Sequence, residues 1–421
     1  MTLERDLPLI GYSNDDPPAL SEILRCTHCG LCLTPRGRIY LMRGVAEGRF
    51  EIDSMFAEHM DVCLACRACQ TACPASIDFG KMVEAARWQA NQALPKSRAE
   101  QFVRWLVFKQ IFPSNRRLRF VATLMKFYQR SGMQWLARRL RLIPRGLRES
   151  ERLLPRMSHR FTALGRTYPA QGTRRGRVAL LAGCVMGTAY AAVNKSTIRV
   201  LTRNGFEVVV PAQQICCGAL AVHAGERAIA RQMAQKNIDA FSTPAIAFDA
   251  IIVNAAGCGV AMKEYGDLLQ ADAEWRERAE AFAERVRDVS EFLAARGITP
   301  PTHAIHKRAT YQDPCHLAHG QGIRAQPREL LRAIPGLRLV EMRDAELCCG
   351  SAGIYNITHP DISKQVLDAK MESVRAAEPE LIVTANAGCM LQLQLGAQRA
   401  GLDAEVVHVV ELLDRSYRGK E

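Results

Sequence analysis

Short apolar runs alternate with longer amphipathic stretches in the C-terminal part of the chain. The runs are VALLAG, FEVVVP and AIIVNAAG at 178–183, 206–211 and 250–257, followed by ATYQD, LRLVEM and LIVTA at 309–313, 337–342 and 381–385. Runs of this length that are rich in Val and Ile predict strands, and strands that alternate with helices indicate an α/β arrangement with a largely parallel sheet. The pattern therefore predicts two α/β units in succession.

The middle of the chain has a helical and strongly basic pattern. Residues 98–112 (RAEQFVRWLVFKQIF) are typical of an amphipathic helix, and Lys and Arg outnumber Asp and Glu by 21 to three between positions 96 and 177. Such a stretch suits anionic lipid, nucleic acid or an acidic protein face, or it is only a solvated helical surface. We expect Phe102, Trp105, Phe108 and Phe112 to help dock the protein on a partner or on a membrane surface.

The composition of the 421 residues, 48% hydrophobic and 24% charged, is that of a globular protein with several domains. The first ten residues carry charges of both signs, and no uninterrupted apolar run approaches 18 residues. We therefore expect neither an export signal nor a membrane span. Fifteen cysteines in such a chain favour metal binding or redox chemistry over a disulfide framework.

Eight of the cysteines form an internal repeat. Cys184 and Cys258 each lie 131 residues before Cys315 and Cys389, and the pair Cys216 and Cys217 lies 132 residues before Cys348 and Cys349. A glycine follows each adjacent pair and permits the backbone to bend sharply. We expect each repeat to gather its four thiolates around one metal centre. The alternatives are a reversible disulfide between adjacent cysteines, or reduced cysteines with a packing role.

The other seven cysteines form two runs near the N-terminus. Cys63, Cys66, Cys69 and Cys73, followed by Pro74, have the C-x2-C-x2-C-x3-C-P spacing that holds a [4Fe-4S] cluster in bacterial ferredoxins, whereas structural zinc usually takes paired C-x2-C units. Cys26, Cys29 and Cys32 repeat the first part of this spacing.

In two-cluster ferredoxins the fourth cysteine of each run binds the other run's cluster. Cys73 is therefore expected to complete the cluster of Cys26, Cys29 and Cys32. Cys63, Cys66 and Cys69 are left with three thiolates, because Arg36 stands where the first run would have its fourth cysteine. This second site is expected to hold a [3Fe-4S] cluster, to hold a [4Fe-4S] cluster with a ligand other than cysteine, or to be empty.

Several histidines lie close to the cysteines. His28 lies within the first run, His316 and His319 follow Cys315, and His223 and His359 follow the two CCG turns. His28 either tunes the cluster through a hydrogen bond or is an ordinary polar residue of the loop. The other four side chains could be ligands or proton carriers. The first repeat has no histidine that corresponds to His316, which argues against a general ligand role.

The motifs CTHCGLC, PRGRIYLMRG, CLACRACQTACP, DPCHLAHGQGIRAQPREL and CCGSAGIYNITHPDI together resemble the iron-sulfur subunit of glycolate oxidase, over nearly the whole chain. Their order is also similar to that of the iron-sulfur subunit of anaerobic glycerol-3-phosphate dehydrogenase and of the B subunit of heterodisulfide reductase. The resemblance implies electron transfer from FAD on partner subunits, which oxidise glycolate or a similar 2-hydroxy acid, towards a membrane quinone. It implies a cytoplasmic protein that is peripheral on the inner face of the membrane.

Two other functions compete with this interpretation. One is reduction of disulfides at the CCG repeats, which Ala261 and Gln392 place in doubt because heterodisulfide reductase repeats have a cysteine there. The other is nucleic-acid binding, for which the basic stretch contains no recognisable module. No nucleotide-binding G-x-G-x-x-G or Walker A motif is evident, so a flavin is expected on a partner, and no catalytic residue is expected in this chain.

These inferences define the expected architecture, an α+β multidomain protein. Residues 1–95 form a helical, ferredoxin-like iron-sulfur domain, and residues 96–176 form a basic helical connector. Residues 177–300 and 301–421 form the first and second CCG cysteine-rich domains.

Overall fold

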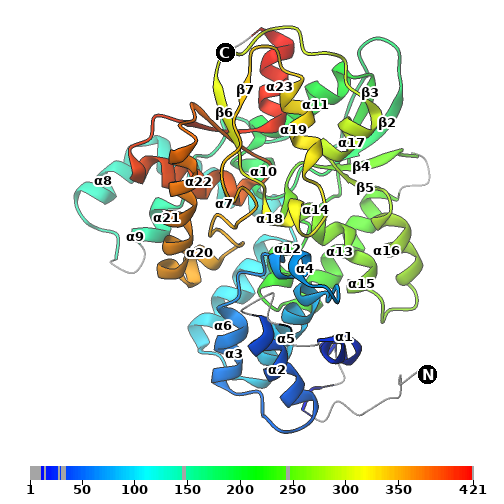
Figure 1. Cartoon of the computed structure of the whole chain (residues 1–421), viewed down its shortest axis with the longest axis vertical. Coiled ribbons are helices and arrows are strands. Elements are labelled where there is room, and N and C mark those ends of the chain that lie inside the picture. The colour runs from blue at the N-terminus through cyan, green and yellow to red at the C-terminus, as the bar shows by residue number, and fades with distance from the viewer. Residues whose placement is uncertain are drawn as a thin grey trace.

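The computed structural model describes residues 11–13, 16–26, 29, 35–144, 148–242 and 247–419. The N-terminal module (residues 16–95) contains five helices in its described part: α1 (Leu20–Arg25), α2 (Pro35–Ala46), α3 (Ser54–Asp61), α4 (Ala68–Ala72) and α5 (Phe79–Ala93). Their apolar faces enclose a small core that includes Ile39, Met60 and Met82, and α5 runs through its centre (Figure 1). The Asp53 side chain accepts a hydrogen bond from the Phe56 amide and so fixes the start of α3.

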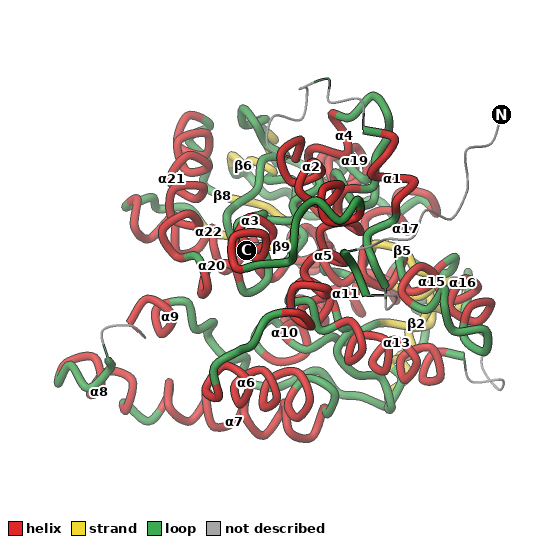
Figure 2. Tube along the Cα trace, turned by 90° about the horizontal axis from the view of Figure 1, so that it is seen from below, coloured by secondary structure: helices red, strands yellow, loops and turns green. Residues whose placement is uncertain are grey.

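A second group of helices connects this module to the repeats. It comprises α6 (Arg98–Arg104), a π-helix η1 (Trp105–Ile111), α7 (Asn115–Arg130), α8 (Met133–Arg139) and α9 (Arg148–Arg152). The helix predicted over 98–112 is thus present, but it changes from α to π geometry at Trp105. Figure 2 shows α6, α7 and α8 along one edge of the molecule, with α8 extending beyond the body.

The first repeat is a five-stranded sheet in the order β1-β3-β2-β4-β5, with helices on both faces. All neighbouring strands are parallel except β1, which runs antiparallel to β3. The strands are β1 (Arg166–Tyr168), β2 (Gly176–Leu180), β3 (Phe206–Val210), β4 (Ala250–Val253) and β5 (Val286–Asp288). The helices are α10 (Val185–Thr188), α11 (Ala191–Arg203), α12 (Ala219–His223), α13 (Arg227–Phe241), α14 (Ala256–Lys263), α15 (Tyr265–Leu268), α16 (Arg276–Ala283) and α17 (Val289–Arg296).

The second repeat has a four-stranded parallel sheet in the order β7-β6-β8-β9, which repeats the order β3-β2-β4-β5. Its strands are β6 (Arg308–Tyr311), β7 (Arg338–Leu339), β8 (Leu381–Thr384) and β9 (Glu405–His408). Its helices are α18 (Cys315–Ala318), α19 (Ala325–Arg332), α20 (Tyr355–Thr358), α21 (Pro360–Ala376), α22 (Ala387–Ala400) and α23 (Val409–Arg418).

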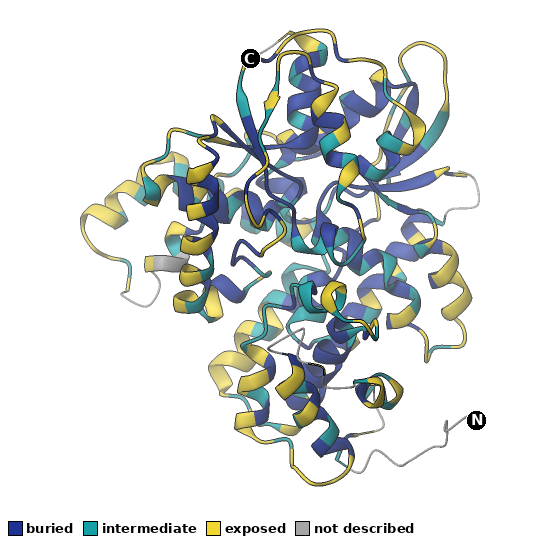
Figure 3. Ribbon diagram, viewed as in Figure 1, coloured by how far each residue is buried: buried dark blue, intermediate teal, exposed yellow. Residues whose placement is uncertain are grey.

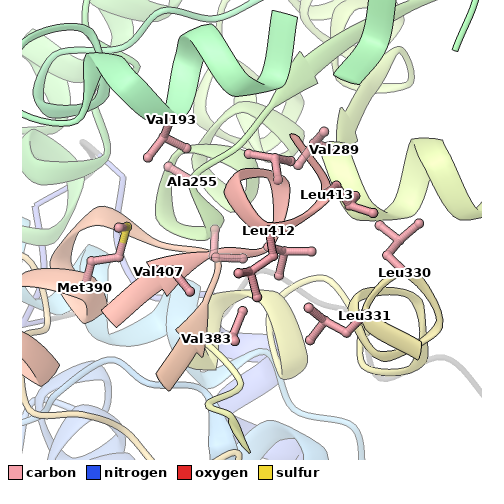
Figure 4. Packing of buried hydrophobic residues seen from close by; sticks show 14 of the residues in the cluster. Val193, Ala255, Val289, Leu330, Leu331, Val383, Met390, Val407, Leu412 and Leu413 are labelled. Atoms are coloured by element: carbon pink, nitrogen blue, oxygen red, sulfur yellow. The ribbon is translucent and has the colours of Figure 1, made fainter. Parts of the chain in front are cut away.

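One hydrophobic core is continuous between the two repeats. Figure 4 shows Val193 and Val289 of the first repeat in the same cluster as Leu330, Val383 and Leu412 of the second. Helix α11 packs closely on α23, and Arg199 pairs with the buried Asp414 at 2.5 Å. The repeats are therefore fixed relative to each other, because separating them would expose this apolar surface to water.

The predicted fold class is confirmed: helical segments and two repeated α/β units make up an α+β protein. All six predicted strands are present, whereas β1, β5 and β9 were not predicted. The described residues include no helix that is long and apolar enough to cross a membrane.

Candidate metal centres

The 63–69 loop, which carries Cys63, Cys66 and Cys69, has an unusual backbone. Ala65 and Arg67 both have positive φ, 50° and 63°, a left-handed conformation that side chains other than glycine seldom adopt. These reversals fold the loop back on itself, and the Ala65 amide donates to Cys63 Sγ at 3.4 Å. Strain of this kind is kept where the surrounding structure enforces it, often at functional sites.

The first cysteine run lies beside the end of the second. Cys26 follows α1, and the Arg25 guanidinium donates to the Ala75 carbonyl at 2.6 Å, two residues beyond Cys73. Cys26 and Cys73 pack against the same small core. Cys29 is exposed, whereas Cys32 and His28 lie outside the described residues. Arg25, the residue before Cys26, therefore contacts the chain two residues beyond Cys73.

The four cysteines of the first repeat come together at the carboxyl ends of its strands. Cys184 follows β2, the adjacent Cys216 and Cys217 follow β3, and Cys258 lies in the first turn of α14 after β4. Cys184 and Cys216 Sγ lie 3.5 Å apart, and the thiols interact in series through Cys217 to Cys258. Gly218 has the positive φ (83°) that turns the chain after the pair.

The second repeat gathers its cysteines in the same way. The thiols interact in series from Cys315 through Cys348 and Cys349 to Cys389. The Gly350 amide donates to Cys348 Sγ at 3.3 Å, and the Asn386 side chain donates to Cys389 Sγ at 3.5 Å. In the described part of the chain, no three Cys, His, Asp or Glu side chains are placed to hold a single metal ion.

The donor sets fit iron-sulfur clusters. Such a cluster is bound by thiolates that are spread over several irons, and backbone hydrogen bonds to the sulfurs tune its potential. Interaction with Cys216, and then burial, raises the pKa of Cys184; interaction with Cys348, and then burial, raises that of Cys315. The raised pKa values argue against reactive free thiols at these positions.

The 63–69 loop packs on the second repeat. His316 Nε2 donates to the Ala65 carbonyl at 3.0 Å, and the Tyr355 hydroxyl donates to the Val62 carbonyl at 2.9 Å. Burial raises the pKa of Cys66 to about 11, and the nearby Cys315 thiol adds to the rise. Cys66 thus lies next to the second cysteine quartet.

The same loop is bound to the first repeat through a buried ion pair. The guanidinium of Arg67, which is 4% exposed, makes two hydrogen bonds to the Glu264 carboxylate. Glu84 of α5, also buried, lies 3.7 Å from Arg67 and 2.9 Å from His223 Nδ1. A cavity of about 290 Å³ opens beside these groups. Both repeats therefore contact the N-terminal module at its cysteine loop.

His319 and His359, also singled out from the sequence, contact this interface or lie near it. His319 Nδ1 lies 2.9 Å from the Thr71 hydroxyl, and His359 stacks on Tyr355 with ring centroids 4.5 Å apart. Sequence reasoning missed Arg67, Glu84, Glu264 and Tyr355. The position of Arg67 inside the cysteine run was the only available signal, because its partner lies 197 residues away.

Two family models match the chain. The CCG cysteine-rich domain matches residues 178–263 and again 309–394, and the linker region of the glycolate oxidase iron-sulfur subunit matches residues 99–154.

Curated relatives match over most of the chain. It is 39% identical to the probable glycolate oxidase iron-sulfur subunit of Bacillus subtilis (strain 168), over 98% of both chains. It is 32% identical to the glycolate oxidase iron-sulfur subunit of Escherichia coli (strain K12), over 94% of both. It is also 30% identical to lactate utilization protein A of Oceanobacillus iheyensis, over 58% of this chain and 98% of that protein.

Proposed function

Because this chain belongs to the family of glycolate oxidase iron-sulfur subunits, we propose that it carries electrons from a flavin on partner subunits towards a membrane quinone. The substrate of the complex is then a small 2-hydroxy acid, with glycolate the first choice. The names of two relatives, glycolate oxidase and lactate utilization, refer to acids of this class. This supports a 2-hydroxy acid as the substrate class.

The observation that carries this proposal is the contact between the 63–69 loop and the second quartet. Iron-sulfur clusters bound at these cysteines would accept and release single electrons. We assign Cys26, Cys29, Cys32 and Cys73 to one site and Cys63, Cys66 and Cys69 to a second. The quartets of the repeats, Cys184, Cys216, Cys217 and Cys258, and Cys315, Cys348, Cys349 and Cys389, form two more. The Ala65 carbonyl oxygen and His316 Nε2 lie 3.0 Å apart, and these residues are next to the proposed ligands Cys66 and Cys315.

The purified chain alone is expected to oxidise no glycolate, whereas adding its FAD-bearing partner subunits should produce activity. Hydride removal from a 2-hydroxy acid requires a group such as a flavin. We propose that this chain does not bind the flavin but receives electrons from it. Anaerobic reduction of an artificial electron acceptor by glycolate measures the activity of the chain alone and of the chain with its partner subunits. Turnover by the flavin-free single chain would refute the division of labour.

The connector helices supply a surface for the membrane step. Twelve of the 18 exposed large apolar side chains in the described part of the chain lie between positions 102 and 142. On α7, the exposed residues Phe120, Leu124 and Phe127 follow each other at helical spacing, with Arg116 and Arg130 at the two ends of the row. Apolar side chains among basic ones suit the headgroup region of an anionic bilayer. Figure 3 shows the exposed surface of α8 on the side that projects from the body.

The structure corrects part of the docking prediction. Phe102 and Trp105 are exposed, but Phe108 is buried and Phe112 packs against the core of the first repeat. The Arg104 guanidinium donates to Glu226 at 2.7 Å and to the Ala224 carbonyl, so it serves the connection to the first repeat. The proposed membrane surface therefore consists of the outward residues of α6, the start of η1, α7 and α8.

Replacing Phe120, Leu124 and Phe127 with serine is expected to lower partition onto vesicles that contain phosphatidylglycerol at least about tenfold. Each substitution removes an apolar side chain whose transfer from water is worth about 1.5–3 kcal/mol when complete. Vesicle sedimentation measures the change. The matched control replaces Leu347 and Ile357, exposed residues of the second repeat, with serine and should bind normally. Equal partition of both variants would exclude this surface, and loss of flavin-subunit binding alone would identify it as a protein interface.

A further inference from the structure

His316 lies where three cysteine-bearing segments meet. It follows Cys315 directly, and its Nε2 bonds to the carbonyl of Ala65, between Cys63 and Cys66. On the other side of the ring, a Cβ at Gly257 would lie 3.5 Å from His316 Nδ1, and Gly257 directly precedes Cys258. The His316 side chain thus bonds to the 63–69 loop and lies beside Gly257 in the segment of the first quartet, and its backbone belongs to the second.

The hydrogen bond to Ala65 fixes the orientation of the imidazole. A carbonyl oxygen only accepts, so Nε2 of His316 carries the proton and donates. Nδ1 faces Gly257. A side chain without a donor could occupy the same volume, but it would leave the Ala65 carbonyl without this partner.

A second histidine, His223, packs against the His316 ring. The rings of His223 and His316 lie 5.1 Å apart between centroids, and His223 Nδ1 pairs with Glu84 of the N-terminal module. The His223 carbonyl also accepts a hydrogen bond at 3.1 Å from Arg87, whose guanidinium donates to the Cys63 carbonyl as well. The first repeat and the N-terminal module therefore both restrict where His316 lies.

The two repeats differ at this position. The residue that corresponds to His316 in the first repeat is Val185, which packs against the hydrophobic clusters. Valine has no donor for the backbone of the 63–69 loop. In the described part of the chain, the hydrogen bond to the Ala65 carbonyl therefore comes from the second repeat, although the two quartets have nearly the same cysteine spacing.

We propose that His316 is a positioning residue that fixes the 63–69 loop relative to the cysteines of both repeats, and so sets the coupling between the proposed redox sites. This inference rests on the proposed function for its purpose, but the positioning itself is a property of the chain. Tyr355 and His319 hold the loop at Val62 and Thr71 independently, so loss of His316 should shift the loop without unfolding the module.

The test compares His316→Leu, His316→Gln and His306→Leu in the full-length chain, purified anaerobically with its iron. Leucine removes the donor, glutamine keeps an N–H that reaches Ala65, and exposed His306 precedes β6, at the strand end opposite Cys315. Hydrogen exchange of the peptide over residues 60–72 reports loop position without any turnover. EPR of the reduced protein reports magnetic interaction between neighbouring centres.

We expect His316→Leu to raise exchange over residues 60–72 about tenfold and to weaken the magnetic interaction, with iron content unchanged. His316→Gln should largely restore the slow exchange and the magnetic interaction, and His306→Leu should resemble the unaltered protein. Unaltered exchange in His316→Leu would overturn the proposal, as would loss of iron from the 63–69 loop, which would make His316 a ligand. If the repeats hold no centre, the unaltered protein shows no magnetic interaction with them; the proposed function then fails, while exchange still decides the positioning role.

Discussion

Changing Cys73 to serine is expected to remove the cluster assigned to Cys26, Cys29 and Cys32 while the site of Cys63, Cys66 and Cys69 keeps its iron. The expectation follows from crossed ligation in paired ferredoxin runs. The described geometry is consistent with it, because Arg25, next to Cys26, binds the Ala75 carbonyl, two residues beyond Cys73. In the 63–69 loop, by contrast, Cys66 lies close to Cys315 of the second repeat.

Iron analysis and EPR in the oxidised and reduced states distinguish the two sites. A [3Fe-4S] centre in the loop would be paramagnetic when oxidised, and an all-cysteine [4Fe-4S] centre of this type when reduced. Cluster potential depends on cluster type and net charge, so the site with one thiolate fewer should have the higher potential. Cys69→Ser is the reciprocal variant and should remove only the loop signal. Two four-iron signals that both survive Cys73→Ser would disprove the assignment.

The strands next to the cysteines could be predicted from sequence because their pattern is local. The run 178–183 is continuously apolar and the run 250–257 is interrupted only by Asn254, and both end in Gly, as is typical of buried parallel strands. The strands that were missed are short or at an edge. β1 has three mostly exposed residues, and β5 has three residues that lead directly into the capped start of α17. Neither leaves enough residues for a period-2 pattern to be detected.

The contacts between the modules could not be predicted from the sequence. The aromatic residues of 98–112 look equivalent in a helical pattern, yet Phe108 and Phe112 pack on the first repeat while Phe102 and Trp105 face outwards. The switch to a π-helix at Trp105 changes the number of residues per turn and therefore the face on which later residues lie. Similarly, nothing near Arg67 in the sequence indicates a carboxylate at position 264.

Changing Arg67 to methionine is expected to destabilise the docked N-terminal module by about 3–5 kcal/mol. Removing one partner of a buried ion pair leaves the other charge without compensation, and this loss typically lowers the free energy of unfolding by about 3–5 kcal/mol. Arg67 has only 3% of its side chain exposed, and it approaches two carboxylates, Glu264 and Glu84. Glu84 keeps His223 as a partner in the variant, so the loss falls mainly on Glu264.

Anaerobic urea unfolding measures this effect through tryptophan fluorescence, to which the buried Trp88 of α5 contributes. Arg43→Met is the matched control, because Arg43 of α2 and Glu47, which follows the helix, form a surface pair that should contribute at most about 1 kcal/mol. The double variant Arg67→Met/Glu264→Met removes both charges and should recover most of the loss, since a buried pair and an apolar replacement are often nearly equal in stability. If Arg67→Met unfolds at the same urea concentration as Arg43→Met, the ion pair does not hold the module on the repeats. If the double variant is as unstable as the single one, the loss comes from packing of the long Arg67 side chain and not from the unpaired charge.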